Sequence, residues 1–316
     1  MLCSDCLGNP RGIRSGSGEA TESTSSTREL GRTNPLCCWC TALVLASIIV
    51  RNYLSASKSV TSPADLVTAG RFNIPALSEK YHVYALDLLG FGLSDKPVQD
   101  YPAEVWRDQV LDFIQEVVKR PCAVAGNSLG GFTALYASSS PVANANRLIT
   151  SCILLNAAGR FRNPEGEVKK EVPKWRQSIL DAIQRLVIGF SFIYTKQPAR
   201  VEQILRQVYP VNADMVDSEL VESIVHPSRH PNAAEVFYRV IKRNGNGPPV
   251  YVDDLLSSLE VPLLLLWGEK DPWIRPQAAD KIQAIYPKAV RVSVDAGHCP
   301  HDEAPAAVNA AIMDFV

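Results

Sequence analysis

From about Gly70 onward, short apolar segments alternate with amphipathic ones, and this alternation restricts the fold more than any other feature of the chain. The apolar segments have the length and composition of β-strands, and they occupy residues 82–88, 122–126, 152–156, 261–267 and 290–294. Apolar residues at helical spacing, such as Trp106, Val110 and Phe113, indicate a helix over residues 102–119. Buried strands that alternate with helices form a mostly parallel sheet with helices on both faces. The sequence therefore predicts an α/β fold.

Residues 159–250 do not follow this alternation. They carry helix-like stretches separated by prolines, at residues 174–190, 198–208, 214–224 and 233–242. A helical block inserted between two strands covers the edge of the sheet, where it shapes the substrate site and excludes water. We therefore predict a sheet-bearing core at residues 70–158 and 251–316, and a helical cap at residues 159–250.

The predicted cap carries more large apolar side chains than a solvated insertion needs, among them Trp175, Ile179, Phe190 and Phe192. One interpretation is that these side chains line an apolar pocket, and the other is that they pack onto the sheet. A pocket of this kind would favour long apolar substrates over short ones.

The first 69 residues have a different character. Residues 1–34 are rich in Gly, Ser, Thr and Arg, and we predict that they are disordered. Ser and Arg are typical of a transit peptide, but acidic residues such as Asp5 and Glu19 weaken that match. Residues 36–50 form an apolar run that is shorter than the roughly 20 residues of a membrane-spanning helix. This run fits a signal-type segment, a membrane-associated helix or a buried strand.

Charge and cysteine content exclude several classes of protein. The 316 residues include 32 Lys and Arg and 33 Asp and Glu, so the net charge of −1 offers no basic surface, and we expect no nucleic-acid partner. Cys3 and Cys6 have the spacing of a metal knuckle, but the cysteines at residues 37–40 run straight into the apolar segment. His226 and His230 are four residues apart, but a proline follows each and argues against a helix there. We therefore expect no metal ion and no organic cofactor.

Residues 126–130 read Gly-Asn-Ser-Leu-Gly and match the pattern G-x-S-x-G, with a predicted strand before it and a predicted helix after it. In this setting Ser128 lies on a sharp turn at the carboxyl end of the strand. Leu129 begins the helix, so its free backbone N–H can stabilise negative charge on a carbonyl oxygen. Ser128 is therefore the candidate nucleophile, and the Leu129 N–H is the candidate oxyanion donor. The alternative is a tightly packed glycine turn without a catalytic role.

A serine hydroxyl needs a base to take its proton, and the base needs an acidic group to orient it. Asp271 follows the strand predicted at residues 261–267, and His298 follows the strand predicted at residues 290–294. Both therefore reach the same sheet edge as Ser128. Their order along the chain, serine then acid then histidine, is the one expected for this motif. We predict a catalytic triad of Ser128, Asp271 and His298.

Other acidic residues near these strands are weaker candidates for the orienting acid. Asp295 is too near His298 in sequence to reach its far ring nitrogen easily, and Glu269 is closer to the strand end than Asp271. Asp87 precedes a Gly-Phe-Gly loop and is interpreted as a brace for that loop.

His301 is the other histidine near the predicted site. It is followed by Asp302 and Glu303, so we interpret it as a solvated or helix-entry residue.

Several strings along the chain carry a family resemblance, and they are DLLGFGLSDKP at 87–97, GNSLGGFTALYAS at 126–138, LLNAAGRF at 154–161, GEKDPWIRP at 268–276 and AGHCPHDEAP at 296–305. With these strings, the chain from Gly70 to Val316 resembles the serine α/β-hydrolases, and specifically their pheophytinase-like subgroup of chloroplasts and cyanobacteria. The D-P-W and G-H-C-P-H-D-E strings point to the subgroup, whereas the other motifs are shared by many esterases. Epoxide hydrolases and dehalogenases have a similar first loop but carry Asp at the place of Ser128.

The resemblance implies an α/β-hydrolase fold and hydrolysis of a large apolar ester. In the subgroup this ester is the phytyl ester of pheophytin, which gives pheophorbide and phytol. The resemblance also implies a chloroplast location and a role in chlorophyll catabolism. We expect a monomer whose partner is a small-molecule ester, with peripheral membrane contact as an open expectation. The alternatives are a general lipase or thioesterase, and a catalytically impaired binding protein.

The chain departs from the family pattern in its first 69 residues. The family has, shortly before the segment seen here at 71–81, a central strand that ends in His-Gly, and the following loop supplies a second oxyanion N–H. No His-Gly pair occurs before Gly70. Residues 43–50 are long and apolar enough to replace that strand, but Ala42, Leu45 and Ile49 also fit a helical face. We favour a separate helix outside the sheet and predict an incomplete oxyanion hole.

Overall fold

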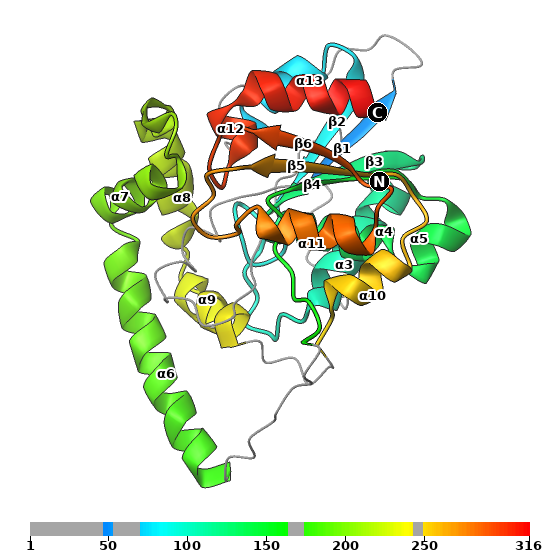
Figure 1. Cartoon of the computed structure of the whole chain (residues 1–316). Coiled ribbons are helices and arrows are strands. Elements are labelled where there is room, and N and C mark those ends of the chain that lie inside the picture. The colour runs from blue at the N-terminus through cyan, green and yellow to red at the C-terminus, as the bar shows by residue number, and fades with distance from the viewer. Residues whose placement is uncertain (1–46, 53–69, 164–173, 243–248) are drawn as a thin grey trace, which may run out of the picture.

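The computed structural model describes residues 47–52, 70–163, 174–242 and 249–316. The predictions for residues 1–34, for the first part of the apolar run and for the five N-terminal cysteines lie outside these residues. A single sheet of the order β2-β1-β3-β4-β5-β6 forms the centre of the molecule (Figure 1). Its strands are β1 Ser47–Asn52, β2 Tyr81–Leu86, β3 Cys122–Asn127, β4 Ile149–Leu155, β5 Leu263–Gly268 and β6 Val290–Val294. The five strands predicted after Gly70 are therefore confirmed.

Strand β1 corrects the prediction of a separate helix. It lies between β2 and β3 and is antiparallel to both, with Ser47 opposite Leu86 and Ile48 opposite Ala125. The other adjacent pairs, from β3 to β6, are parallel. The helix prediction is wrong because an unpaired gap between β2 and β3 would leave the backbone N–H and C=O groups of both strands without partners. Strand β1 satisfies them.

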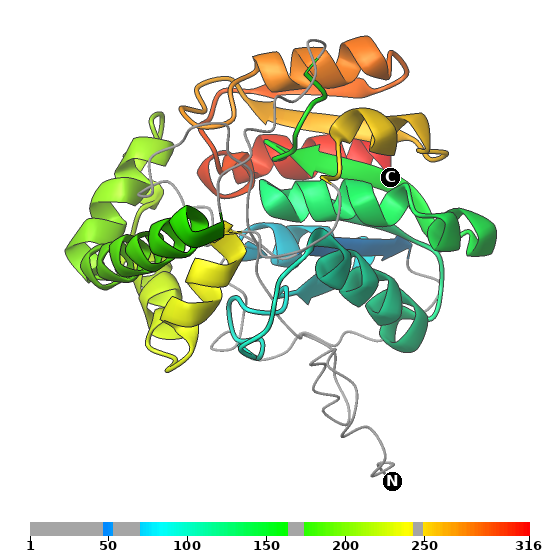
Figure 2. The ribbon, with the colours of Figure 1, turned by 90° about the horizontal axis from the view of Figure 1, so that it is seen from below.

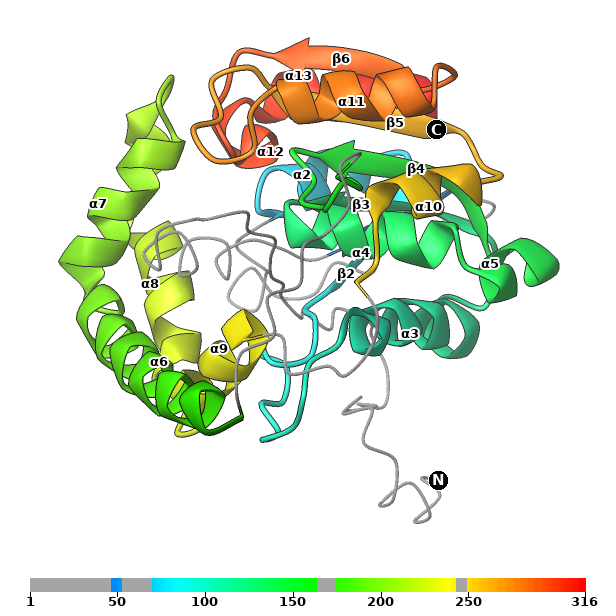
Figure 3. The same cartoon turned by 60° about the horizontal axis from the view of Figure 1, so that its bottom comes forward.

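Helices cover both faces of the sheet (Figures 1 and 3). One face carries α3 Ala103–Phe113, which continues as a π-helical turn at Ile114–Val118, together with α4 Leu129–Ser138, α10 Val252–Ser257 and α11 Gln277–Ile285. The opposite face carries α2 Asn73–Leu77, α12 Pro300–Glu303 and α13 Pro305–Phe315. A short helix, α5 Pro141–Asn146, precedes β4. Each face buries its own apolar cluster, which makes the sheet a rigid platform for its carboxyl edge.

Four further α-helices lie between β4 and β5 in the chain and form a group beyond the carboxyl ends of the parallel strands (Figures 1 and 3). They are α6 Lys174–Thr195, α7 Pro198–Val208, α8 Ser218–Ser228 and α9 Ala233–Lys242, with a 3₁₀ turn at Ala213–Met215 before α8. The same group is the yellow-green part of Figure 2 and lies to one side of the sheet. The four predicted helices are present.

Two boundaries in this group differ from the sequence predictions. Helix α6 extends to Thr195 because no proline interrupts it before Pro198. Helix α8 begins at Ser218, with Asp217 accepting the N–H of Leu220 as its cap, and it includes Pro227 in its last turn. None of the described helices is long and apolar enough to cross a membrane.

Candidate active site

Ser128 occupies the turn between β3 and α4 in a strained backbone conformation. Its φ is +53°, a value that a non-glycine residue adopts only when the surrounding structure enforces it. The turn is so tight that a Cβ on Gly126 would lie 2.2 Å from the carbonyl carbon of Gly130. The side chain of Ser128 is fully buried, and its Oγ makes no hydrogen bond among the described residues. A buried hydroxyl without a partner is costly, and this pattern is typical of functional sites.

Leu129 is the first residue of α4, so its backbone N–H has no acceptor within the helix. The neighbouring Ser128 N–H is occupied, because it donates to the Leu155 carbonyl at 2.9 Å. Of these two adjacent N–H groups, the one on Leu129 is therefore suited to an oxyanion.

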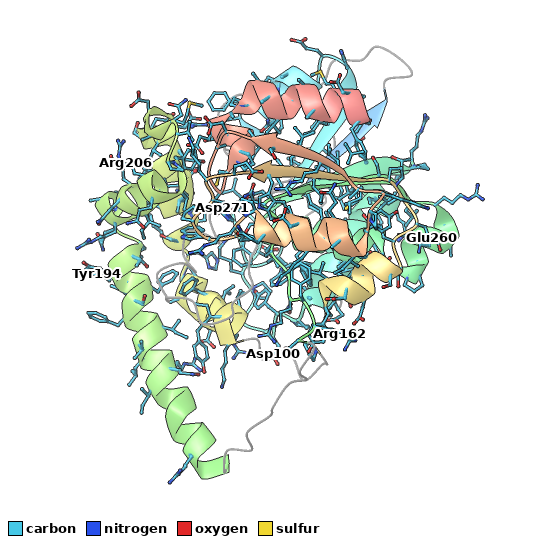
Figure 4. All side chains as sticks on the ribbon, viewed as in Figure 1. Asp100, Arg162, Tyr194, Arg206, Glu260 and Asp271 are labelled. Atoms are coloured by element: carbon cyan, nitrogen blue, oxygen red, sulfur yellow. The ribbon has the colours of Figure 1, made fainter. Side chains whose placement is uncertain are left out.

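Asp271 follows β5 and is held at the carboxyl edge of the sheet by four hydrogen bonds. Its Oδ1 accepts the backbone N–H groups of Trp273 at 2.7 Å and Ile274 at 3.0 Å. Its Oδ2 accepts the side-chain amide of Asn156 and the Nδ1–H of His298, both at 2.7 Å. Figure 4 shows Asp271 between the strand ends and the helices α7 to α9. These bonds fix the position of the carboxylate and engage both of its oxygens.

His298 follows β6 and is held by its backbone as well as by Asp271. Its N–H donates to the carbonyl of Val208, the last residue of α7, at 3.1 Å. Its carbonyl accepts the side-chain amide of Asn127 at 2.7 Å. The Trp273 ring lies 5.0 Å from the imidazole, centroid to centroid, and covers the pair. The opposite ring nitrogen, Nε2, is buried and makes no hydrogen bond within the described residues.

The structure therefore joins Asp271 and His298 by a direct hydrogen bond, and it does not join Ser128 to His298 in that way. Ser128 is linked to the histidine through its neighbour Asn127, the last residue of β3. The Ser128 hydroxyl, the His298 Nε2 and the Asn127 Oδ1 are the three side-chain atoms of this set that have no hydrogen-bond partner among the described residues. Catalytic hydrogen bonds of unliganded sites are often long and tighten when substrate binds.

The competing acids lie elsewhere. Asp295 is exposed and pairs with Lys270 at 2.8 Å, and Glu269 pairs with Arg291 at 3.1 Å on the surface. Asp87 is buried, and its Oδ2 accepts the N–H of Leu93 at 2.7 Å. The interpretation of Asp87 as a loop brace is therefore confirmed.

Two asparagines near the site were not singled out from the sequence. Asn156 is fully buried after β4, where it accepts the N–H of Gly268 at 2.8 Å while it donates to Asp271. It thus ties the end of β4 to the loop that carries the acid. Asn127 does the same for the histidine loop. Their positions at the carboxyl ends of β4 and β3 were the available signal, because parallel strand ends meet at one edge.

Of the two interpretations of His301, the helix-entry one is confirmed, because His301 is the second residue of α12, and the solvated one is wrong. His301, Asp302 and Glu303 are all buried, because the short helix α12 packs between the sheet and the segment after α7. Burial, together with the nearby His298 and Arg71, lowers the pKa of His301 to about 3. The imidazole of His301 is therefore neutral, and its Nδ1 has no partner among the described residues.

Glu303 bridges two segments. Its Oε1 accepts the N–H groups of Val211 at 2.7 Å and Asn212 at 2.9 Å, and its Oε2 accepts the N–H of Gly297. Since Gly297 directly precedes His298, Glu303 holds the histidine loop against the segment after α7.

Asp302 belongs to a second bridge. Its carboxylate accepts Arg71 Nε at 2.9 Å and the Tyr209 hydroxyl at 2.9 Å. Arg71 also donates to Asp217, the cap of α8, at 2.6 Å. Burial raises the pKa of Asp302 despite these donors. The residues around His298 are thus fixed to α7 and α8 as well as to the sheet.

Strand β1 decides how the oxyanion side of the site is built. Because β1 is antiparallel to β3, the residues after Asn52 leave the sheet at the edge opposite Ser128. The end of β1 itself, at Asn52, is therefore remote from the serine. Among the described residues, the N–H of Leu129 is the candidate oxyanion donor.

Three cysteines, Cys122, Cys152 and Cys299, lie buried within the described residues and form no disulfide there. Burial raises the pKa of the Cys152 and Cys299 thiols. Within the described ranges, no three His, Cys, Asp or Glu side chains are grouped so that they could hold a metal ion.

The sheet, the serine turn and the buried Asp–His pair are together typical of an α/β-hydrolase fold. A family model described as the alpha/beta hydrolase family matches residues 62–311. The match spans most of the chain, so the chain belongs to the alpha/beta hydrolase family.

Relatives of known sequence agree with this. The chain is 35% identical over 235 residues to pheophytinase, chloroplastic, of Arabidopsis thaliana, which covers 70% of this chain and 46% of that protein. It is 27% identical over 238 residues to Lipase 1 of Psychrobacter immobilis, covering 72% of this chain and 66% of the lipase. The chain thus spans about half of the pheophytinase and about two thirds of the lipase.

A solved structure confirms the fold. The enol-lactonase from Burkholderia xenovorans LB400 superposes with a TM-score of 0.61 at 16% identity, over 85% of this chain and 95% of that chain. At this identity the likeness shows the α/β-hydrolase fold.

Proposed function

We propose that this chain hydrolyses a carboxylic ester through Ser128, His298 and Asp271. The observation that carries the proposal is the hydrogen bond between the buried Asp271 and His298 at the sheet edge where Ser128 is held in its strained turn. In this mechanism Ser128 Oγ attacks the ester carbonyl, and His298 Nε2 takes the serine proton and returns it to the leaving alcohol. Asp271 orients the imidazole, and the Leu129 N–H stabilises the oxyanion.

The proposed substrate is a large apolar ester, and the specific candidate is the phytyl ester of pheophytin. The likeness to pheophytinase and to a lipase supports this choice. The same likeness supports a role in chlorophyll catabolism and a chloroplast location as proposals. A general lipase or thioesterase with the same three residues is the nearest alternative.

Within this proposal, residues 70–158 and 251–316 form the hydrolase core and residues 159–250 act as a cap. The position of α6 to α9 beyond the strand ends supports this division (Figure 3). One of the predicted pocket residues does not fit this role: Phe190 is 74% exposed, so it does not line an enclosed pocket. Phe192 is buried and its ring lies 5.3 Å from that of Phe237. The side chains of Trp175 and Ile179 lie outside the described residues.

A fluorophosphonate probe tests the nucleophile. The probe should label Ser128 in the native protein, and the Ser128→Ala variant should not be labelled. Ser151→Ala is a matched control, because Ser151 is a buried serine within β4. Labelling at another residue, or labelling that persists in Ser128→Ala, would refute the assignment.

The substrate is tested by comparing hydrolysis of pheophytin with hydrolysis of a short p-nitrophenyl ester. A higher kcat/KM for pheophytin supports the phytyl ester. A preference for short acyl esters, with no turnover of pheophytin, would instead support a general esterase.

A second function is favoured by the direction of β1. Loss of one oxyanion donor costs about 10²–10³ in kcat, so a chain without a second donor would act chiefly as a binding protein for an apolar ester. Such a protein would bind pheophytin with equal affinity as the native chain and as Ser128→Ala, measured by quenching of tryptophan fluorescence. It would show no turnover that depends on Ser128.

A further inference from the structure

Helix α6 exposes an unusual number of large apolar side chains. Six of them are between 45% and 75% exposed, and they are Ile183, Leu186, Val187, Phe190, Ile193 and Tyr194. These positions have the spacing of one helix face and cover about 120° of the circumference at 3.6 residues per turn. We call this set the α6 stripe. Exposed apolar patches of this kind mark interaction surfaces.

The stripe lies on the side of α6 that faces away from the rest of the molecule. The opposite side of the helix packs inward, where Ile188 and Phe192 are buried and Arg185 pairs with Glu235 of α9. Figure 4 shows Tyr194 on the outer side of α6, directed away from the sheet. The inner face of α6 is therefore already used, and the outer face is unpartnered among the described residues.

The charge around the stripe is strongly positive. Residues 174–206 contain six Lys and Arg side chains against two Asp and Glu, a net charge of +4 in a chain whose total is −1. Two of the cations lie beside aromatic rings: Arg200 lies 4.7 Å from the centre of the exposed Tyr194 ring, and Lys196 lies 5.8 Å from that of the buried Phe192. An apolar helix face with flanking cations and aromatic rings is typical of helices that lie in the interface of an anionic lipid surface.

We propose that the α6 stripe docks this protein on an anionic lipid surface. The apolar side chains enter the boundary between headgroups and acyl chains, and the flanking cations contact the anionic headgroups. The proposal goes beyond ester hydrolysis and does not depend on Ser128.

The position of α6 gives the docking a consequence for the site. Helix α7 begins at Pro198, three residues after α6 ends, and its last residue Val208 accepts the backbone N–H of His298. A lipid surface bound at α6 is therefore joined through one helix to the histidine loop.

Vesicle flotation with the full chain tests the proposal. The native protein should float with vesicles of phosphatidylglycerol and phosphatidylcholine in equal parts, and should float less with pure phosphatidylcholine. The double variant Leu186→Ser/Phe190→Ser should partition into the mixed vesicles at least about tenfold less, because it removes apolar surface that the lipid would bury. The double variant Leu93→Ser/Val142→Ser is the matched control, since both residues are exposed apolar side chains outside α6, and it should float like the native protein.

The charge component has its own test. Lys196→Gln/Arg200→Gln should reduce flotation with the mixed vesicles and leave flotation with pure phosphatidylcholine unchanged, and added salt should have the same effect. Circular dichroism and the thermal midpoint of each variant establish that it is folded.

Three outcomes would overturn the proposal. One is that the native protein does not bind the mixed vesicles. Another is that the stripe variant and the control variant bind equally. The third is a dimer in light scattering that Leu186→Ser/Phe190→Ser dissociates, because the stripe is then covered by a second copy of the chain. In each case fluorophosphonate labelling of Ser128 is unaffected, so failure of the docking surface is distinguishable from failure of the proposed function.

Discussion

On the side of Ser128 formed by β5, β6 and α12, polar groups are held by bonds from several directions, whereas on the other side the described strand β1 runs away from the serine. Asp271 accepts four hydrogen bonds, and the histidine loop is tied to α7 and to Glu303. Strand β1 instead leaves the sheet at the opposite edge. The difference teaches that the position of an acid–base pair is fixed by many local bonds, while an oxyanion loop depends on the direction of a single strand.

The largest effect is expected on the acid–base side. Asp271→Asn replaces the acceptor of the His298 Nδ1–H by a group that also donates, so the imidazole takes the wrong tautomer. We expect kcat to fall by about 10³–10⁴, measured with a p-nitrophenyl ester. Asp295→Asn is the matched control, because Asp295 is three residues from His298 but is exposed and pairs with Lys270. Equal losses of kcat in both variants would refute the assignment of Asp271 as the acid that orients His298.

Removing the bridge at Glu303 tests how firmly the histidine loop is held. Glu303→Ala leaves the N–H groups of Val211, Asn212 and Gly297 without their acceptor. The free energy of unfolding should fall by about 3 kcal/mol or more, as measured by urea denaturation. Glu260→Ala, at an exposed position on the far side of the molecule (Figure 4), should change it by less than about 0.5 kcal/mol. An unchanged free energy of unfolding in Glu303→Ala would show that the bridge does not stabilise the loop.

The buried His301 predicts a pH dependence of stability. Its pKa of about 3 in the folded chain lies below the ordinary 6.5, so the unfolded chain binds a proton that the folded chain excludes. The contribution of the neutral His301 to the free energy of unfolding is therefore fully present above pH 6.5. As the pH falls from 6.5 toward 3, this free energy decreases by up to about 1.4 kcal/mol per pH unit. His301→Gln should make the fall in unfolding free energy below pH 6.5 less steep. An unchanged slope in His301→Gln would contradict the prediction.

The smallest effect is expected on the side of β1. Asn52→Gly introduces the flexible residue that an oxyanion loop needs, but at the edge of the sheet away from Ser128. We expect kcat to stay within about twofold of the native value, with a stability loss of about 1 kcal/mol from glycine in a strand. A clear increase in kcat would show that residues after β1 reach the site after all.

The sequence predicted the strands after Gly70 and the serine turn well because both depend on local order. Apolar runs such as residues 290–294 and the glycines around Ser128 have few alternative conformations. The pairing of Asp271 with His298 was also predictable, because parallel strands bring their carboxyl ends to one edge. The roles of Asn156 and Glu303 were not, because their partners are distant in sequence and become neighbours only when the loops pack.

What the sequence by itself determined is the alternation of strands and helices, the tight turn at Ser128 and the order of the serine, the acid and the histidine. Only the tertiary structure decided that residues 47–52 form a strand, that this strand is antiparallel to its neighbours, and that His301 is buried. The physical reason is that an apolar run of this length suits a helix and a strand equally. The rest of the chain places β2 and β3 on either side of this run. Their backbone N–H and C=O groups need hydrogen-bond partners, and only a strand between them supplies these.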